Sequence, residues 1–349
     1  MLNYLLRKII YGLLVLAGVV TFVFWMFQGF GDPARMVMGQ TGDSATIANI
    51  KKDLYLDQPR WKQFLLYVND VSPIAIHNKE EIKKKELKGL FIGGENNLAF
   101  KIPYLRKSYL TKKEVWQVLM EALPGTIMLA LAAMFIATVP GITLGVIAAV
   151  KKDSWLDTSS VFTSILGISA PSFFMGILIA YVFGFVLNHY TGLNMTGSWF
   201  DIDVQTGEKK LTLQNLILPA ITLGIRPLAI ITQLTRSAML DVLNQDFVRT
   251  AYAKGLSKRT VIWKHALRNA LNPVITAVTG WFAELLAGAF FVEYIFGWKG
   301  IGKVTVDALE KLDYPVVMGS VLLSAFIFVL INILADVLYG VVDPRVRVG

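Results

Sequence analysis

Two charged side chains lie inside long apolar stretches, where a charge is expensive and needs a reason. Arg226 interrupts the apolar run 211–235, and Glu284 interrupts the run 273–296. A charge at the centre of a bilayer costs at least about 2.5–3.5 kcal/mol, so each should face a partner or a water-filled cavity. The two residues therefore either line a path through the membrane or form a structural ion pair, with each other or with a second subunit.

A basic, polar island separates these two apolar runs. It extends from Asp246 to Pro273 and has amphipathic pieces on either side of Gly255. Ser257 is a candidate N-cap, because its hydroxyl can accept from an unpaired backbone N–H. The pattern predicts two short helices joined at a glycine. They would form either a docking element for a partner or a basic loop that only sets membrane topology.

Other candidate chemistry in the sequence is weak. The segment 297–304, GWKGIGKV, nearly matches a phosphate-binding loop, but Val304 stands where the pattern needs Ser or Thr. The chain has no cysteine and only three histidines, which have no metal-ligand spacing. We therefore expect no catalytic residue, no metal and no cofactor.

The elements that must position these residues are membrane helices. Of the 349 residues 54% are hydrophobic, and several uncharged runs reach the length of about 20 residues that spans a bilayer. Much of the net charge of +9 lies beside these runs, where it sets orientation, so we expect no nucleic-acid partner. The predicted fold is all-α with six membrane spans, at 9–31, 122–150, 158–188, 211–235, 273–296 and 314–335.

The expected domain organisation follows from these spans. Residues 1–31 form the N-terminus and first span, 32–121 form a large external cap, and 122–349 form the core, with the polar loop at 241–272. Six spans and mostly basic segments at one side put both termini in the cytoplasm. We expect Pro124 to open the second span, Pro171 to break the third and Arg226-Pro227 to interrupt the fourth.

Motifs along the chain resemble those of a known family. The basic island carries Thr250-Ala251, Ala253-Lys254-Gly255-Leu256 and His265-Ala266-Leu267-Arg268-Asn269-Ala270-Leu271. Further matches are Gly31-Asp32-Pro33-Ala34, Leu56-Asp57-Gln58-Pro59, Leu123-Pro124-Gly125-Thr126, Ser169-Ala170-Pro171-Ser172-Phe173, Glu293 with Phe296 and Gly300-Ile301-Gly302, and Asp343-Pro344-Arg345. In this ordered set the chain resembles the B-type permease subunit of bacterial dipeptide, oligopeptide, glutathione or nickel ABC importers.

The resemblance implies a transport subunit with no catalysis of its own. It implies the six-helix type I importer permease fold, the bacterial inner membrane, a second related permease, two cytoplasmic ATPases that hydrolyse ATP, and an external solute-binding protein. Peptides are the expected cargo, and Arg226 and Glu284 would contact the charged ends of a zwitterionic peptide. The segment 71–100 looks like an insertion relative to the family, so its role is not inherited.

The resemblance also assigns site residues. The ATPase-coupling loop would use Arg249, Thr250, Ala251, Ala253, Lys254, Gly255, Leu256, His265, Leu267, Arg268 and Asn269. An apolar face of Val261, Ile262, Ala266 and Leu267 would enter a groove on the ATPase. Glu293, Gly300 and Gly302 would belong to a periplasmic gate region. Arg249 departs from the family's general loop, which is acidic at that place, and Lys299 stands where Pro is usual.

Two other functions compete with an ABC permease. An autonomous secondary transporter or channel would need no ATPase loop and usually shows internal repeats, which this sequence lacks. A membrane-embedded enzyme would need a cluster of reactive side chains within the spans. Arg226 and Glu284 alone do not make such a cluster.

Overall fold

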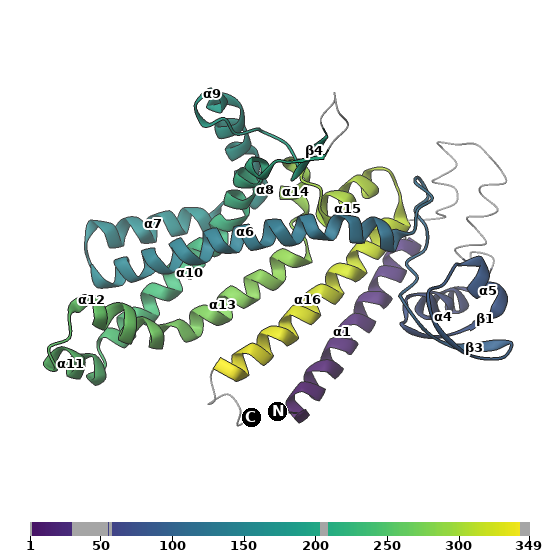
Figure 1. The fold of residues 1–349 in the computed structure, drawn as a ribbon, viewed down its shortest axis with the longest axis horizontal. Helices are drawn as coiled ribbons and strands as arrows, with labels where there is room; N and C mark the ends of the chain where they lie inside the picture. The colour runs from purple at the N-terminus through teal and green to yellow at the C-terminus, as the bar shows by residue number, and fades with distance from the viewer. Residues whose placement is uncertain (1, 30–54, 56–57, 203–208, 343–349) are drawn as a thin grey trace. The chain divides into compact units, whose positions relative to one another are not determined.

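The computed structural model describes residues 2–29, 55, 58–202 and 209–342 (Figure 1). The motifs at 31–34 and 343–345, and residues 56–57 of the motif Leu56-Asp57-Gln58-Pro59, lie outside these residues. The chain forms two compact units. The first comprises Met1–Lys8, Leu123–Lys303 and Ile327–Gly349, and the second comprises Ile9–Ala122 and Val304–Phe326.

The structure confirms an all-α membrane protein. Among the described residues, five helical segments are long and apolar enough to cross a bilayer: Leu6–Phe27, Val115–Val150, Leu213–Leu243, Lys258–Ala287 and Tyr314–Val337. A sixth span arises if the pair Trp155–Ser169 and Ser172–Val186 is one crossing, bent by 105°. The break falls at Ala170-Pro171, as predicted, because proline has no N–H to continue the helix.

Four helices lie side by side in Figure 1: α6 (Val115–Val150), α7 (Trp155–Ser169), α10 (Ile217–Leu243) and α13 (Leu267–Ala287). All belong to the first unit except residues 115–122 of α6. Small residues bring α6 and α10 together, because a Cβ on Gly145 would lie only 2.6 Å from the Thr235 Cβ. Glycine at such positions lets helix backbones approach closely in lipid, where water supplies no driving force between helices. These helices hold the candidate site.

Three predicted helix boundaries were wrong. Helix α6 begins at Val115 and includes Pro124, since the helix-forming residues 115–123 extend it upstream. Pro227 lies inside an unbroken α10, where neighbouring helices make such a proline tolerable. Helix α13 ends before Gly288, whose φ of +131° suits glycine, so the expected span 273–296 stops early.

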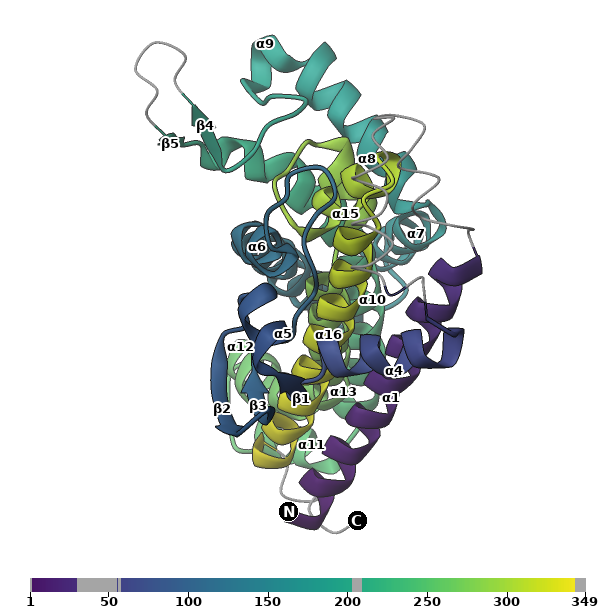
Figure 2. The same cartoon turned by 90° about the vertical axis from the view of Figure 1, so that its right-hand side faces the viewer.

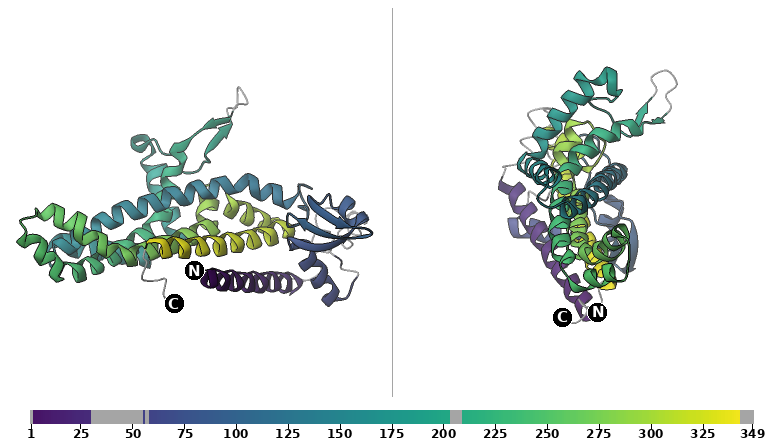
Figure 3. Two further views of the ribbon diagram at one scale, coloured as in Figure 1. Left: turned by 60° about the horizontal axis from the view of Figure 1, so that its bottom comes forward. Right: turned by 90° about the vertical axis from the view of Figure 1, so that its left-hand side faces the viewer.

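Short helices follow α13. They are α14 (Phe290–Ile295) and α15 (Ile301–Glu310), before the long α16 (Tyr314–Val342). Between α7 and α10 the chain forms α8 (Ser172–Ile179), a π-helical segment (Ala180–Val186), α9 (Asn188–Thr191), and the antiparallel strands β4 (Phe200–Ile202) and β5 (Lys209–Leu211). Figure 3 shows this segment in teal, with α9 and the two strands projecting from the helices of the core.

The second unit contains α1 (Leu2–Gly29) from Ile9 onward, and the cap. In the cap, α4 (Arg60–Val71) packs on α1, with the Phe24 ring centroid 5.2 Å from that of Phe64 and 5.6 Å from that of Tyr67. An antiparallel sheet follows, with strand order β1 (Ile74–Asn78), β3 (Asn96–Lys101), β2 (Gly89–Gly93); α5 (Lys79–Lys84) connects β1 to β2 (Figure 2).

A buried polar network holds the cap together. Asp70 is 1% exposed, and its carboxylate accepts from Lys85 Nζ at 2.5 Å. Lys101 Nζ donates to the Asp70 backbone carbonyl. Burial lowers the pKa of Lys101 to about 8, although the Asp70 carboxylate opposes this shift. Lys101 in the cap therefore has a pKa of about 8, well below the usual value of 10.5.

Candidate functional site

The basic island folds as a helix, a turn and the start of a longer helix. Helix α11 (Asp246–Ala253) ends near Gly255, which has a φ of +79°. Ser257 then caps α12 (Lys258–Thr260) by accepting from the Thr260 N–H, as predicted. The expectation of two short helices was wrong, since α12 continues through a π-helical turn (Val261–Ala266) into α13.

The apolar face predicted to enter an ATPase groove is buried within this chain. Val261 and Ala266 are 0% exposed, and they pack in a core cluster with Met239 of α10 and Val146 of α6. Ile262 and Leu267 belong to the same cluster. The assignment of these four side chains to a partner was therefore wrong, because their burial fixes the island to the membrane helices instead.

A different set of side chains lies at the surface of the island. Its large apolar members are Phe247, Tyr252, Leu256 and Trp263, which are 37–44% exposed. Exposed cations surround them: Arg249, Lys254, Lys258, Arg259, Lys264 and Arg268. We call these ten residues the coupling surface. They lie on the green segment at the left end of the helices in the left view of Figure 3.

The predicted coupling-loop residues divide by burial. Exposed members are Arg249, Thr250, Ala253, Lys254, Gly255, Leu256, Arg268 and Asn269, and His265 is partly exposed. Ala251 and Leu267 are buried in the core cluster. The exposed residues are available to a partner, whereas Ala251 and Leu267 support the element from beneath.

Arg226 and Glu284 line one cavity of about 80 Å³ in the first unit. Helix α10 carries Arg226, α13 carries Glu284 and Trp281, and the α7–α8 break adds Ala170 and Ser172. The Arg226 guanidinium carbon lies 5.7 Å from the centroid of the Trp281 ring. This cation–π contact orients the arginine without neutralising its charge.

No ion pair joins Arg226 to Glu284 within residues 2–29, 55, 58–202 and 209–342. Both side chains are exposed in the single chain. The structure therefore gives no support to an ion pair between these two residues. Two opposite charges beside one cavity remain available to a ligand or to another subunit.

A bidentate ion pair between Asp157 and Arg236 was not predicted from the sequence. Arg236 Nε lies 2.5 Å from Asp157 Oδ1, and its Nη2 lies 2.7 Å from Oδ2. Asp157 is 4% exposed and also accepts from the backbone N–H of Asp153. This fork geometry joins α7 to α10 at a fixed angle.

Glu293 lies at the centre of a buried hydrogen-bond network in the first unit. It is 0% exposed, accepts from the Thr126 hydroxyl at 2.8 Å and accepts from the Lys303 N–H at 3.1 Å. The Gly302 N–H also donates to it. Burial raises the pKa of Glu293, although these three donors favour the charged form.

The glycines around Glu293 explain the near-match to a phosphate-binding loop. The N-terminus of α15 directs backbone N–H groups at an anion, as such loops do. Here the anion is the chain's own carboxylate. A Cβ on Gly300 would lie 2.6 Å from the Glu293 Cδ, so glycine is needed for the close approach.

Two distant motifs of the sequence meet at this point. Thr126 Oγ1 accepts from the Ile301 N–H at 2.8 Å, and Trp298 Nε1 donates to the Gly125 carbonyl at 2.9 Å. The start of the membrane-embedded part of α6 is thereby tied to the segment 298–303. We call this arrangement the Glu293 latch, comprising Gly125, Thr126, Glu293, Trp298 and residues 300–303.

Comparisons with known proteins agree with this architecture. The family model described as "Binding-protein-dependent transport system inner membrane component" matches residues 141–348, and the model of its N-terminal part matches residues 1–130. The solved permease-containing structure "Inward facing conformations of the MetNI methionine ABC transporter" superposes with a TM-score of 0.51 at 16% identity, over 65% of this chain and 97% of that chain. This likeness shows the fold.

Curated relatives match the chain from end to end. The di/tripeptide transport system permease protein DppB of Pseudomonas aeruginosa is 36% identical over 99% of both chains, and the dipeptide permease DppB of Escherichia coli K12 is 35% identical over the same shares. The glutathione transport system permease protein GsiC of Escherichia coli K12 is 32% identical, again over 99% of both. The chain therefore belongs to the family of inner membrane components of binding-protein-dependent transport systems.

Proposed function

We propose that this chain forms the translocation path for di- or tripeptides in an ABC importer of the bacterial inner membrane. The observation that carries the cargo proposal is the cavity lined by Arg226 and Glu284. A short peptide is a zwitterion at neutral pH, and its two ends need one cation and one anion. The peptide names of the relatives from Pseudomonas aeruginosa and Escherichia coli support the same class of cargo.

The geometry of the cavity fits a path through the membrane. It lies where α8 turns away from α7 and where α10 and α13 face that break. An unpaired charge facing lipid would cost at least about 2.5–3.5 kcal/mol, so these side chains should face water or a second subunit. In the complex, we propose, Arg226 binds the peptide carboxylate and Glu284 binds its ammonium group.

The coupling surface is where we propose that a cytoplasmic ATPase binds. Exposed aromatic side chains supply large contact areas at low entropic cost, and Trp263 is the best candidate for a dominant contact. The surrounding cations would speed association and fix orientation more than they add affinity. Motion of an ATPase would pass to the membrane helices because the opposite face of the element is buried among α6 and α10.

The Asp157–Arg236 pair and the Glu293 latch would make this transmission rigid. The pair ties α7 to α10, so both helices would move together when the coupling surface moves. The latch, with Glu293, Gly300 and Gly302, ties the opposite part of α6 to the segment after α14. We propose that it forms part of the periplasmic gate.

The remaining partners follow from the same proposal. We infer a second related permease, two ATPases, an external solute-binding protein that docks on the cap side, and lipid around the apolar helices. Lys8 Nζ lies 2.7 Å from Asp336 Oδ2, which supports placing the start of α1 and the end of α16 on the same side of the membrane. The basic segments favour the cytoplasm for that side.

The test is co-purification of the ATPase from membranes with a tag on this chain. Trp263→Ala should lose the ATPase while the variant remains folded. Ala253→Ser, a small change on the same element, is the control and should retain it. If Trp263→Ala retains the ATPase at the wild-type level, the coupling surface is wrongly placed.

The cargo is tested by transport of a dipeptide into vesicles that contain the complete complex. Arg226→Gln should weaken uptake of the free dipeptide more than uptake of its C-terminal amide, since only the former carries the carboxylate. Glu284→Gln should weaken uptake of dipeptides with a free amino group more than uptake of dipeptides whose amino group is blocked. Equal losses for all substrates would contradict direct contact. Uptake by the purified chain without an ATPase would favour a secondary transporter.

A further inference from the structure

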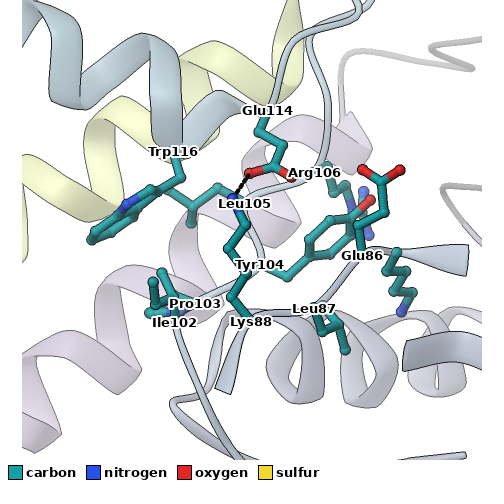
Figure 4. Close-up of a pocket in the computed structure, with 11 residues that line it drawn as sticks. Glu86, Leu87, Lys88, Ile102, Pro103, Tyr104, Leu105, Arg106, Glu114 and Trp116 are labelled. Atoms are coloured by element: carbon teal, nitrogen blue, oxygen red, sulfur yellow. Dashed lines mark ion pairs between the residues drawn. The ribbon is translucent and has the colours of Figure 1, made fainter. Parts of the chain in front are cut away.

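The cap contains a cavity of about 130 Å³ that the proposed transport path does not use. Its lining includes Lys85, Lys88, Tyr104, Arg106 and Trp116, all within the second unit. Liquid water occupies about 30 Å³ per molecule, so the space equals roughly four waters. This is enough for one small polar group with a few attached carbons. Figure 4 shows Trp116 on one side of the cavity and Tyr104 with Arg106 on the other.

Most charges at this cavity already have partners. Lys85 lies 2.5 Å from the Asp70 carboxylate, and Lys88 lies 3.8 Å from Glu114, which is the dashed pair in Figure 4. Glu86 lies 3.2 Å from Lys107, which is outside the lining. Each of these cations and carboxylates is therefore matched, and the remaining charge is that of Arg106.

Arg106 has no anionic partner in the part of the chain that the structure describes. Its Nε atom is buried and has no hydrogen-bond acceptor. Its guanidinium carbon lies 5.9 Å from the Tyr55 ring centroid and 5.4 Å from that of Tyr67. The aromatic rings orient the guanidinium, and its buried Nε–H is left without an acceptor among the described residues.

The backbone at Arg106 is also strained. Its φ is +68°, a left-handed conformation that costs a non-glycine residue about 1–2 kcal/mol. Glycine would adopt this conformation without that cost. The arginine side chain is thus held at a position where the backbone alone favours glycine. Strain of this kind persists only where surrounding contacts hold the conformation in place.

We propose that this cavity is a carboxylate-binding site, with Arg106 as its principal cation, and that its ligand is the free carboxylate of an amino acid or short peptide. The planar guanidinium suits a carboxylate because its N–H groups match the two oxygens. Tyr104 and Trp116 would pack against the carbons next to the carboxylate. The site lies on the cap, apart from Arg226 and Glu284, and goes beyond the proposed transport path.

The test uses the full-length chain in detergent, with L-alanyl-L-alanine and its C-terminal amide as probes. Hydrogen exchange followed by mass spectrometry localises binding to the cap segment 85–116, separately from the cavity in the core. The free dipeptide should protect this segment, and the amide should not. The mid-point concentration of protection gives the affinity.

Arg106→Gly separates a ligand role from a structural one. The glycine relieves the strained φ, which offsets the loss of the contacts between Arg106 and the tyrosine rings. The variant should therefore unfold at about the same temperature as wild type. It should require at least tenfold more dipeptide for the same protection. Lys113→Met removes a nearby exposed cation that does not line the cavity, and it should leave protection unchanged.

Several results would overturn the proposal. Protection by the amide equal to that by the free dipeptide would exclude carboxylate recognition. Unchanged protection in Arg106→Gly would exclude Arg106, and no protection of segment 85–116 at millimolar dipeptide would exclude the site. None of these outcomes bears on uptake by the complete complex, so the proposed transport function stands or fails separately.

Discussion

The Glu293 latch makes a sharp prediction because a single buried carboxylate serves three donors. Glu293→Ala removes the acceptor of the Thr126 hydroxyl and of the backbone N–H groups of Gly302 and Lys303. Leaving a buried donor without an acceptor costs about 1–3 kcal/mol. The hydroxyl can rotate toward another acceptor, whereas the two amides cannot. We expect a loss of about 3–5 kcal/mol, a large part of a typical total stability of 5–15 kcal/mol.

Glu293→Gln is the matched control for this change. Its amide oxygen can accept from the two backbone N–H groups while its NH₂ donates to Thr126 Oγ1. That oxygen already accepts from Ile301 and has a second lone pair. The shape and the bonds are nearly kept, so we expect a loss of about 1 kcal/mol. The protonated form of the native glutamic acid can make the same set of bonds.

The assay is thermal unfolding of the full-length chain in detergent across a pH series. Burial raises the pKa of Glu293 above its ordinary value of 4.5, so the folded state binds the proton more tightly than the unfolded state. Its contribution is present below the ordinary pKa and is lost as pH rises through the raised one. The stability advantage of wild type over Glu293→Gln should therefore shrink as pH rises from about 4.5.

Two outcomes would refute this reasoning. An alanine variant as stable as wild type would mean that the three donors find other acceptors. A difference between wild type and Glu293→Gln that does not change with pH would mean that the carboxyl is not shifted by burial.

Three further predictions concern other parts of the chain. Asp157→Asn leaves the partly buried guanidinium of Arg236 uncompensated and should lower the stability measured by thermal unfolding by about 2–4 kcal/mol. Adding Arg236→Gln to the same chain should recover part of the lost stability. A larger loss in the double variant would contradict the role of the uncompensated charge. Gly255→Ala should lower the stability by only about 1–2 kcal/mol, because the backbone φ is positive but no atom lies within 4 Å of the new Cβ. The variant should still co-purify with the ATPase. Loss of the ATPase would show a contact at that position. The pKa of Lys101 is lowered to about 8, so between about pH 8 and 10.5 the unfolded state binds more protons than the folded state. The stability of the cap, measured as its resistance to pulse proteolysis in urea, should therefore rise over this pH range. In Lys101→Met it should not rise.

The fold class could be predicted from sequence because its cause is local. Uncharged runs longer than about 20 residues must span a bilayer as helices, and their number fixes the topology. The break at Pro171 and the cap at Ser257 were also predictable, since each depends on one residue and its immediate neighbours. Helix ends were less predictable, because Pro124 and Pro227 lie inside helices that tertiary neighbours support.

The candidate site was only partly predictable. Arg226 and Glu284 could be found because charge inside an apolar run is visible in sequence, and the structure places them at one cavity. Their failure to pair depends on the angle between α10 and α13, which no local pattern encodes. The Asp157–Arg236 pair was missed because its members are 79 residues apart and each lies near the polar end of a helix, where a charge attracts no notice.

The sequence by itself determined that this protein crosses the membrane many times, that a basic element separates its fourth and fifth crossings, and that no catalytic cluster should be expected. Those properties follow from composition and spacing along the chain. Only the tertiary structure decided which face of the basic element is free. Val261 and Trp263 are both apolar and two residues apart, but Val261 points into the cluster with Met239 while Trp263 is 44% exposed. Sequence records the period of an amphipathic helix, whereas the direction of its buried face depends on the helices that pack against it.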